Sequence, residues 1–205
     1  MKRLVIIGIF AVAMLLTLAG CQKKNNSKKA EGVKAEADIS GKYNAKITVE
    51  GYGEIEVELD ADAAPVTVQN FMDLVNEGFY DGLTFHRIIS GFMIQGGDPN
   101  GNGTGGSGTN IVGEFKNNGV DNPLKHERGT LSMARSRDNN SASSQFFIMH
   151  EDAPHLDGDY AAFGHVTKGM EVVDEICRVI VPVDSNGTVA EGDQPVIEKI
   201  EMIEK

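Results

Sequence analysis

The chain has 205 residues, a formal net charge of −11 and only two cysteines. This length accommodates one ordinary domain with appendages, and such a domain buries a full core without disulfides or metals. Residues 1–46 carry nine Lys/Arg and three Asp/Glu, so ten basic and 27 acidic residues lie beyond them. A main domain this acidic repels nucleic-acid phosphates, which argues against nucleic acid as a partner.

The first 20 residues have the pattern of an export signal. Lys2 and Arg3 precede an uncharged apolar run from Leu4 to Gly20, which is the order of regions in a signal peptide. A short transmembrane anchor is the alternative for such a run. The tetrapeptide LAGC, which ends at Cys21, resembles the bacterial lipobox, in which the cysteine becomes the lipidated first residue. Residues 1–20 are therefore predicted to be a lipoprotein signal peptide.

Residues 21–46 are predicted to be the lipidated Cys21 and a flexible tether. Lys, Asn, Ala, Glu and Ser dominate this segment, and a segment with few large apolar side chains stays disordered. Acyl chains on Cys21 anchor a protein to a bilayer without spanning it. We expect an extracytoplasmic protein that is lipid-anchored to a bacterial cell membrane, with its folded domain at 47–205. The second cysteine, Cys177, lies on a helix-spaced apolar pattern and is expected to be a buried thiol.

The main domain begins with a strand and a helix. Alternation of apolar residues and glutamates over 47–59 predicts one half-solvated strand. Pro65 then opens a helix that ends at Gly78, because apolar residues recur there at helical spacing.

The rest of the domain is expected to be mostly short strands separated by glycine-rich loops. Strands are predicted at 84–89, 91–95, 130–134, 145–149, 161–166 and 195–203, and a second helix at 170–179. Many short strands with two helices predict a mainly β fold, a closed antiparallel barrel with helical caps.

Four local patterns imitate other chemistries. The run GNGTGG at 101–106 satisfies the dinucleotide pattern G-x-G-x-x-G, but no helical periodicity follows it. Asp98 opens a loop like that of an EF-hand, yet Thr109 stands where the bidentate glutamate is required. His150 and His155 are five residues apart with a proline between them, which does not suit a zinc-protease helix. The sequence contains no G-x-S-x-G elbow, the motif that would indicate a covalent hydrolase.

The segment from Phe85 to Asp98 places one cation in an apolar strand. Alternation puts Phe85, Arg87 and Ile89 on one face. A guanidinium there is costly unless its donors are used, so Arg87 either pairs structurally or points into a ligand groove.

A second run repeats this arrangement of polar and apolar side chains. Gln145 and Phe147 share a face of their strand, as Met93 and Gln95 do in the first run. Apolar side chains beside amide donors and a guanidinium describe a site for a peptide with one apolar side chain.

Six strings in this order resemble the cyclophilin family of peptidyl-prolyl isomerases: FHRIISGFMIQGGD, GNGTGG, GTLSMAR, SSQFFI, HLDGDYAAFGHV and GMEVVDEI. The resemblance runs from about residue 47 to the C-terminus. It implies an eight-stranded antiparallel barrel closed by two α-helices, a surface groove for proline-containing polypeptides, and no metal or organic cofactor. With the lipobox, it implies a bacterial lipoprotein form, expected to be a monomer.

The resemblance also implies roles for individual residues. Arg87 would be the catalytic residue. The proline pocket would be formed by Phe92, Met93, Phe147, Leu156, His155 and Tyr160, and the peptide-backbone groove by Gln95, Gly103, Ala134, Arg135 and Gln145. Three of these depart from the family's common residues, because His155 replaces a tryptophan, Tyr160 a histidine and Arg135 an asparagine.

The implied function is cis-trans isomerisation of peptide bonds before proline, assisting the folding of exported proteins at the outer face of the membrane. Two alternatives use other features of the chain. A non-catalytic proline-peptide binding module or holdase would use the same groove, and a solute-binding lipoprotein would share the anchor and tether.

Overall fold

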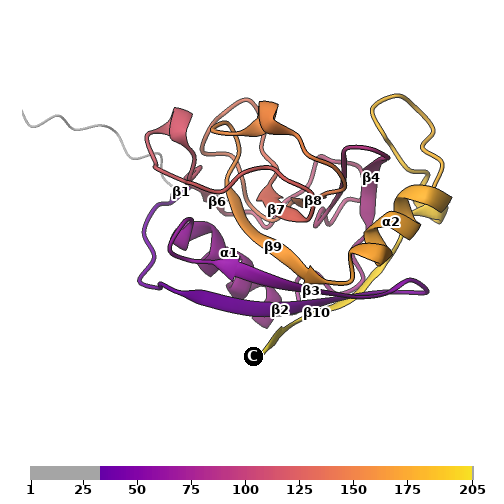
Figure 1. Cartoon of the computed structure of the whole chain (residues 1–205), viewed down its shortest axis with the longest axis horizontal. Helices are drawn as coiled ribbons and strands as arrows, with labels where there is room; N and C mark the ends of the chain where they lie inside the picture. Colours follow the sequence, from indigo (N-terminus) through magenta and orange to yellow (C-terminus); the bar gives the residue numbers. More distant parts are fainter. Residues whose placement is uncertain (1–32, 205) are drawn as a thin grey trace, which may run out of the picture.

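The computed structural model describes residues 33–204 (Figure 1). The predicted signal peptide, the lipidated Cys21 and the first part of the predicted tether lie outside the described residues. No helix within 33–204 is long and apolar enough to cross a membrane.

The main sheet contains eight antiparallel strands. Their order across the sheet is β10 (Ile197–Ile203), β2 (Lys42–Val49), β3 (Gly53–Asp60), β9 (Ala162–Lys168), β7 (Thr130–Met133), β8 (Phe146–Met149), β5 (Met93–Gly96) and β4 (Phe85–Ile89). A separate parallel pair joins β1 (Val33–Lys34) to β6 (Asn110–Ile111). The mainly β prediction and both helices are confirmed, and most strand bounds agree with the predicted ones to within two residues.

The prediction of a closed barrel was wrong. The sheet is strongly curled, but its edge strands β10 and β4 form no ladder, so it is an open half-barrel (Figure 1). The two edges meet through an isolated bridge between Thr84 and Val196 and through single backbone hydrogen bonds beside it, including Phe85 N–H donating to the carbonyl of Pro195 over 2.9 Å. Pro195 itself has no N–H to extend this pairing.

The first predicted strand is a hairpin. The apolar alternation over 47–59 is interrupted, because the chain turns at 50–52 and β2 pairs with β3 from Val49 opposite Gly53 to Lys42 opposite Asp60. Gly51 and Gly53 have φ of 75° and 127°, values that favour glycine and permit the tight turn.

The folded part begins earlier than predicted. Residues 33–46 were expected to belong to the tether, yet they contain β1 and the first half of β2. Ala37 and Ile39 pack against the main core, and Ala45 is fully buried. Local composition missed this because these apolar side chains are few and widely spaced.

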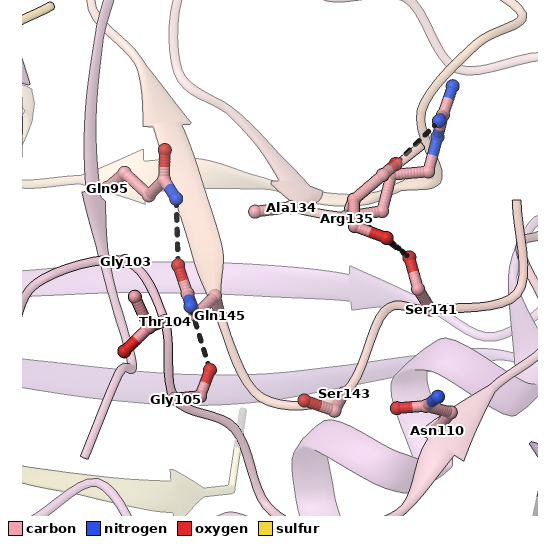
Figure 2. A pocket seen from close by; sticks show the side chains of 11 residues that line it. Gln95, Gly103, Thr104, Gly105, Asn110, Ala134, Arg135, Ser141, Ser143 and Gln145 are labelled. Carbon is pink, nitrogen blue, oxygen red and sulfur yellow. Dashed lines mark hydrogen bonds between the residues drawn. The ribbon is translucent and has the colours of Figure 1, made fainter. Parts of the chain in front are cut away.

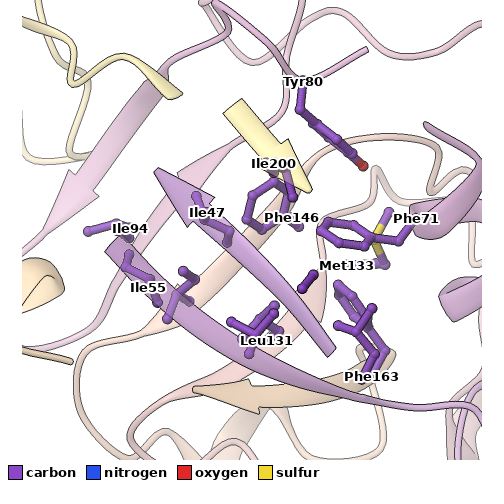
Figure 3. Packing of buried hydrophobic residues seen from close by; sticks show 14 of the residues in the cluster. Ile47, Ile55, Phe71, Tyr80, Ile94, Leu131, Met133, Phe146, Phe163 and Ile200 are labelled. Carbon is purple, nitrogen blue, oxygen red and sulfur yellow. The ribbon is translucent and has the colours of Figure 1, made fainter. Parts of the chain in front are cut away.

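Two helices and the curled sheet enclose the main core. α1 (Pro65–Asn76) and α2 (Met170–Val179) contribute buried apolar side chains to it. Aromatic rings fill its centre, where Phe71 lies 5.2 Å from Tyr80 and 5.5 Å from Phe146 between ring centroids (Figure 3). Cys177 is buried in α2 as expected, and burial raises the pKa of its thiol to about 12.

The N-terminus of α1 is capped from another part of the chain. Its N-cap residue, Ala64, has no side-chain acceptor. Glu114, only 3% exposed, accepts hydrogen bonds instead from the N–H of Val66 at 3.0 Å and of Thr67 at 2.7 Å. A carboxylate at this end also interacts favourably with the helix dipole.

Candidate active site

A β-bulge aims Arg87 at the surface. The ladder of β4 with β5 shifts between Phe85 and Arg87, so Phe85 enters the main core while Arg87 lines a surface hollow. The prediction that Phe85, Arg87 and Ile89 share one face was therefore wrong for Phe85, because a bulge inserts a residue and reverses the alternation.

The Arg87 guanidinium is held on one side. Its Nε donates to the carbonyl oxygen of Asn186 at 2.7 Å, and Nη1 lies 3.2 Å from Oε1 of Gln95 and 3.6 Å from Sδ of Met93. Within residues 33–204, Nη2 makes no hydrogen bond, so its two N–H groups remain available to a ligand. Burial lowers the pKa of Arg87, and the charge of Asp184 opposes this shift; a guanidinium still stays protonated at neutral pH.

A directed chain of amides fixes Gln95. The carbonyl oxygen of Gly105 accepts from Nε2 of Gln145 at 2.8 Å, and Oε1 of Gln145 accepts from Nε2 of Gln95 at 2.9 Å (Figure 2). Because a backbone carbonyl only accepts, it fixes the orientation of both side-chain amides. Gln95 therefore presents its oxygen, not its nitrogen, to Arg87.

An apolar hollow of about 240 Å³ lies beside Arg87. Its walls are Arg87, Phe92, Met93, Gln95, Ala134, Arg135, Phe147, Leu156 and Tyr160. Met93 and Phe147 are buried, and together with Met149 and Ala153 they form a small cluster separate from the main core. Phe147 and Tyr160 meet edge to face at 5.9 Å. The shape and lining suit one compact apolar ring.

A buried histidine supports the floor of this hollow. His126, 1% exposed, stacks on Phe147 with ring centroids 6.0 Å apart. Its ring nitrogens lie 3.1 Å from Oδ1 of Asp157 and 2.9 Å from Oγ of Ser132. Burial lowers the pKa of His126 despite the opposing carboxylate of Asp157, so the neutral ring is favoured.

His155 was predicted to line the proline pocket, and the structure places it elsewhere. Its ring stacks on Phe92 at 5.8 Å, but the side chain is exposed and is not among the walls of the hollow. The short 3-10 turn Pro154–Leu156 points Leu156 inward and leaves His155 on the outside.

A second, more polar hollow of about 320 Å³ adjoins the first. The two share Gln95, Ala134 and Arg135. Its other walls are Gly103, Thr104, Gly105, Asn110, Ser136, Ser141, Ser143 and Gln145 (Figure 2). Arg135 turns its guanidinium away from Gln145 in this view, because Nε donates to the carbonyl of Asp159 at 2.9 Å and Cζ lies 4.8 Å from the ring centroid of Tyr160.

Asp98 shapes the loop that carries Gly103. Its side chain is buried, and its carboxylate accepts from the backbone N–H of Asn100 at 2.8 Å, Asn102 at 3.1 Å and Gly103 at 2.5 Å. Burial raises the pKa of Asp98, but these three donors together outweigh it and the net shift is downward. The loop that resembled nucleotide and calcium motifs is thus a wall of the groove, organised by its own aspartate.

Together these features describe a surface groove that accommodates an extended chain. One hollow takes an apolar ring, the adjoining hollow takes a polar side chain, and a fixed cation with free donors stands at the edge of the first. No group of three or more His, Cys, Asp or Glu within residues 33–204 is placed to hold a metal ion. Such an arrangement can hold an extended peptide and place hydrogen-bond donors against it.

Comparison with known proteins agrees with this description. Residues 44–203 match the family model described as cyclophilin type peptidyl-prolyl cis-trans isomerase/CLD. Peptidyl-prolyl cis-trans isomerase B of Bacillus subtilis is 54% identical over 123 residues, which cover 60% of this chain and 82% of that protein. A crystal structure of a cyclophilin type isomerase from Cryptosporidium parvum superposes with a TM-score of 0.71 at 32% identity, covering 80% of this chain and 99% of that one.

The same Cryptosporidium protein was also solved in the presence of the dipeptide Ala-Pro, and that structure matches with a TM-score of 0.69. The chain belongs to the cyclophilin family and is an enzyme of the peptidyl-prolyl cis-trans isomerase class.

The structure brings together the predicted groove residues Gln95, Gly103, Ala134, Arg135 and Gln145. Sequence reasoning missed several partners that come from distant segments, including Asn186, Asn110, Ser141, Ser143 and His126. Asn186 acts through its backbone carbonyl, 99 residues from Arg87, so its side-chain identity gave no signal. His126 lies in a loop-like stretch that gave no signal, and its partner Asp157 is 31 residues away.

Proposed function

We propose that Arg87 catalyses the isomerisation by donating a hydrogen bond that forms only in the transition state. The bond before proline resists rotation because the nitrogen lone pair is delocalised into the carbonyl, which gives a barrier near 20 kcal/mol. When the bond twists, this delocalisation is lost and the nitrogen becomes an acceptor. A donor aimed at it binds the twisted state more tightly than the planar one.

The observation that carries this proposal is the free Nη2 group on an otherwise immobilised guanidinium. Asn186 and Gln95 hold Nε and Nη1, so little reorganisation is needed when Nη2 meets the substrate. The guanidinium lines the same hollow as Met93 and Phe147. A proline ring seated there would bring its nitrogen to the side of the hollow where the donor stands.

The remaining groove residues would hold the peptide while one part of it turns. The apolar hollow would fix the proline ring, and amide groups such as that of Gln145 would bind the flanking backbone. Lowering the barrier by roughly 7 kcal/mol would accelerate rotation about 10⁵-fold.

Arg87→Ala tests this role. We expect kcat/KM on a proline tetrapeptide, measured with the full chain in a mild detergent, to fall about 10²- to 10³-fold, as when one oxyanion-type donor is removed. Arg178→Ala is the matched control, because Arg178 is an exposed arginine of α2 that pairs with Glu175. Undiminished activity of Arg87→Ala refutes the mechanism. Tight peptide binding by a wild-type chain that does not accelerate exchange would favour a binding module.

We further propose that the enzyme works at the outer face of the membrane on exported proteins. The support is the basic residues Lys2 and Arg3, the apolar run and the lipobox-like LAGC ending at Cys21. Cys21→Ala should release the protein from the membrane fraction or block its processing. Unchanged membrane retention would refute the lipid anchor.

A further inference from the structure

The segment 33–39 lies outside the part of the chain that matches the family model, which begins at residue 44. It is nevertheless attached to the body. β1 pairs in parallel with β6, with Val33 opposite Asn110 and Lys34 opposite Ile111. The N–H of Val112 also donates to the carbonyl of Lys34 over 2.9 Å.

Side chains of this segment make further contacts. Nζ of Lys34 lies 2.7 Å from Oδ2 of Asp73 on α1, and Ala37 and Ile39 pack against the main core. The segment thus bridges α1 and β6 rather than trailing from the domain.

β6 in turn forms one wall of the second hollow. Asn110 lines that hollow, and the N–H of Ile111 donates to the carbonyl of Ala142 over 2.8 Å. The neighbours of Ala142, Ser141 and Ser143, line the same hollow beside Asn110 (Figure 2). Three segments therefore lie in adjoining rows: β1 on the outer side, β6 in the middle, and residues 141–143 next to β6.

A strand of two residues has few bonds of its own, and an unpaired edge of such a strand fluctuates. The side chain of Asn110 is exposed, so packing does not fix it and its position depends on the backbone of β6. We propose that the N-terminal segment 33–39 is a positioning element for the second hollow, and that it sets which side chain beside the proline the enzyme prefers. This inference rests on the proposed function of the groove.

The lining of the hollow defines the side chain that it selects. Thr104 and Ser141 use their hydroxyls within the protein, donating to Oδ1 of Asn102 and to the carbonyl of Asp138. Asn110 and Ser143 present an uncharged amide and a hydroxyl to the hollow. Because the two hollows share three residues, a peptide with proline in the first places a neighbouring side chain over the second. Within the described residues, the side chains of Asn110 and Ser143 have no hydrogen-bond partner. An uncharged polar side chain such as glutamine can bond to them, whereas leucine leaves them unpaired.

The test compares two peptides that share the same Xaa-Pro pair and differ only in one residue next to that pair, which is Gln in one peptide and Leu in the other. Both are assayed with the full chain in detergent. We expect wild type to prefer Gln by about fivefold in kcat/KM, the worth of one hydrogen bond. Lys34→Pro removes a ladder donor from β1 and should bring the ratio near one. The kcat on the Leu peptide should change by less than about twofold. Lys34→Gln keeps the backbone pairing and should keep the wild-type ratio.

Release of β1 is measured separately, as faster hydrogen exchange at the Val112 amide. Should Lys34→Pro unfold the chain, Lys34→Gly weakens the same pairing and is judged by the same ratio. If the Val112 amide exchanges faster but the Gln/Leu ratio of kcat/KM is unchanged, the inference is wrong and the isomerase function still stands. The same conclusion follows if the wild type shows no preference between the two peptides. An inactive wild type overturns the proposed function itself.

Discussion

Gln95→Met is the sharpest test of how the groove prepares Arg87. Methionine has nearly the length of glutamine, but its thioether is only a weak acceptor in place of the amide oxygen that lies 3.2 Å from Nη1 of Arg87. A hydrogen bond to a charged group contributes about 1.5–3 kcal/mol, and the lower value applies here because the pair is half-exposed. If that energy is present only when the guanidinium is correctly aimed, kcat/KM should fall about tenfold.

The loss should be smaller than that for Arg87→Ala, because Nε of Arg87 keeps its 2.7 Å bond to the carbonyl of Asn186. The assay is exchange between cis and trans peaks of a proline tetrapeptide by NMR. Gln69→Met is the matched control, since the Gln69 side chain donates to Oδ1 of Asp73 on the same helix, α1, and lies outside both hollows. A Gln95→Met enzyme as active as this control would refute the argument that the amide chain holds the catalytic donor.

Two further changes test the frame around the groove. Glu114→Ala should lower the free energy of unfolding by about 3 kcal/mol, because it leaves the N–H groups of Val66 and Thr67 buried without an acceptor; chemical denaturation would show this, and the exposed Glu77→Ala should change it by less than about 0.5 kcal/mol. His86→Leu should reduce the loss of stability in acid. Both ring nitrogens of His86 are buried without a partner within the described residues, and burial lowers its pKa, with Asp98 opposing and Arg87 assisting. The folded state thus binds fewer protons than the unfolded one. The contribution of neutral His86 to the free energy of unfolding is therefore complete above about pH 6.5 and declines as the pH falls below it. The measurement is the melting temperature at pH 7.5 and at pH 5. An equal decrease in wild type and in His86→Leu would contradict this prediction.

The helices and most strands could be predicted from the sequence because their signals are local. Pro65 and the apolar spacing after it define α1, and alternation places Gln145, just before β8, on the same face as Phe147 of β8. The family resemblance implied twelve site residues, and the structure brings eleven of them together around the two hollows. His155 was the exception, because one turn of 3-10 helix decides which of two adjacent side chains faces inward.

Other features were decided only by tertiary structure. Alternation counts residues along one strand, so it could not reveal the bulge that separates Phe85 from Arg87 or the turn that splits 47–59 into a hairpin. Whether the curled sheet closes depends on how its first and last strands meet, and these are far apart in the chain.

What the sequence by itself determined was the reaction class, because its ordered strings resemble those of the cyclophilin isomerases; alternation alone indicated only an arginine in an apolar strand, near a face that holds Met93 and Gln95. What tertiary structure decided was the aim of these groups. The carbonyl of Asn186 reaches Arg87 across 99 residues, and Val33 of β1 pairs with Asn110 of β6. Contacts of this kind follow from the closure of long loops around a shared core, and no local pattern records them.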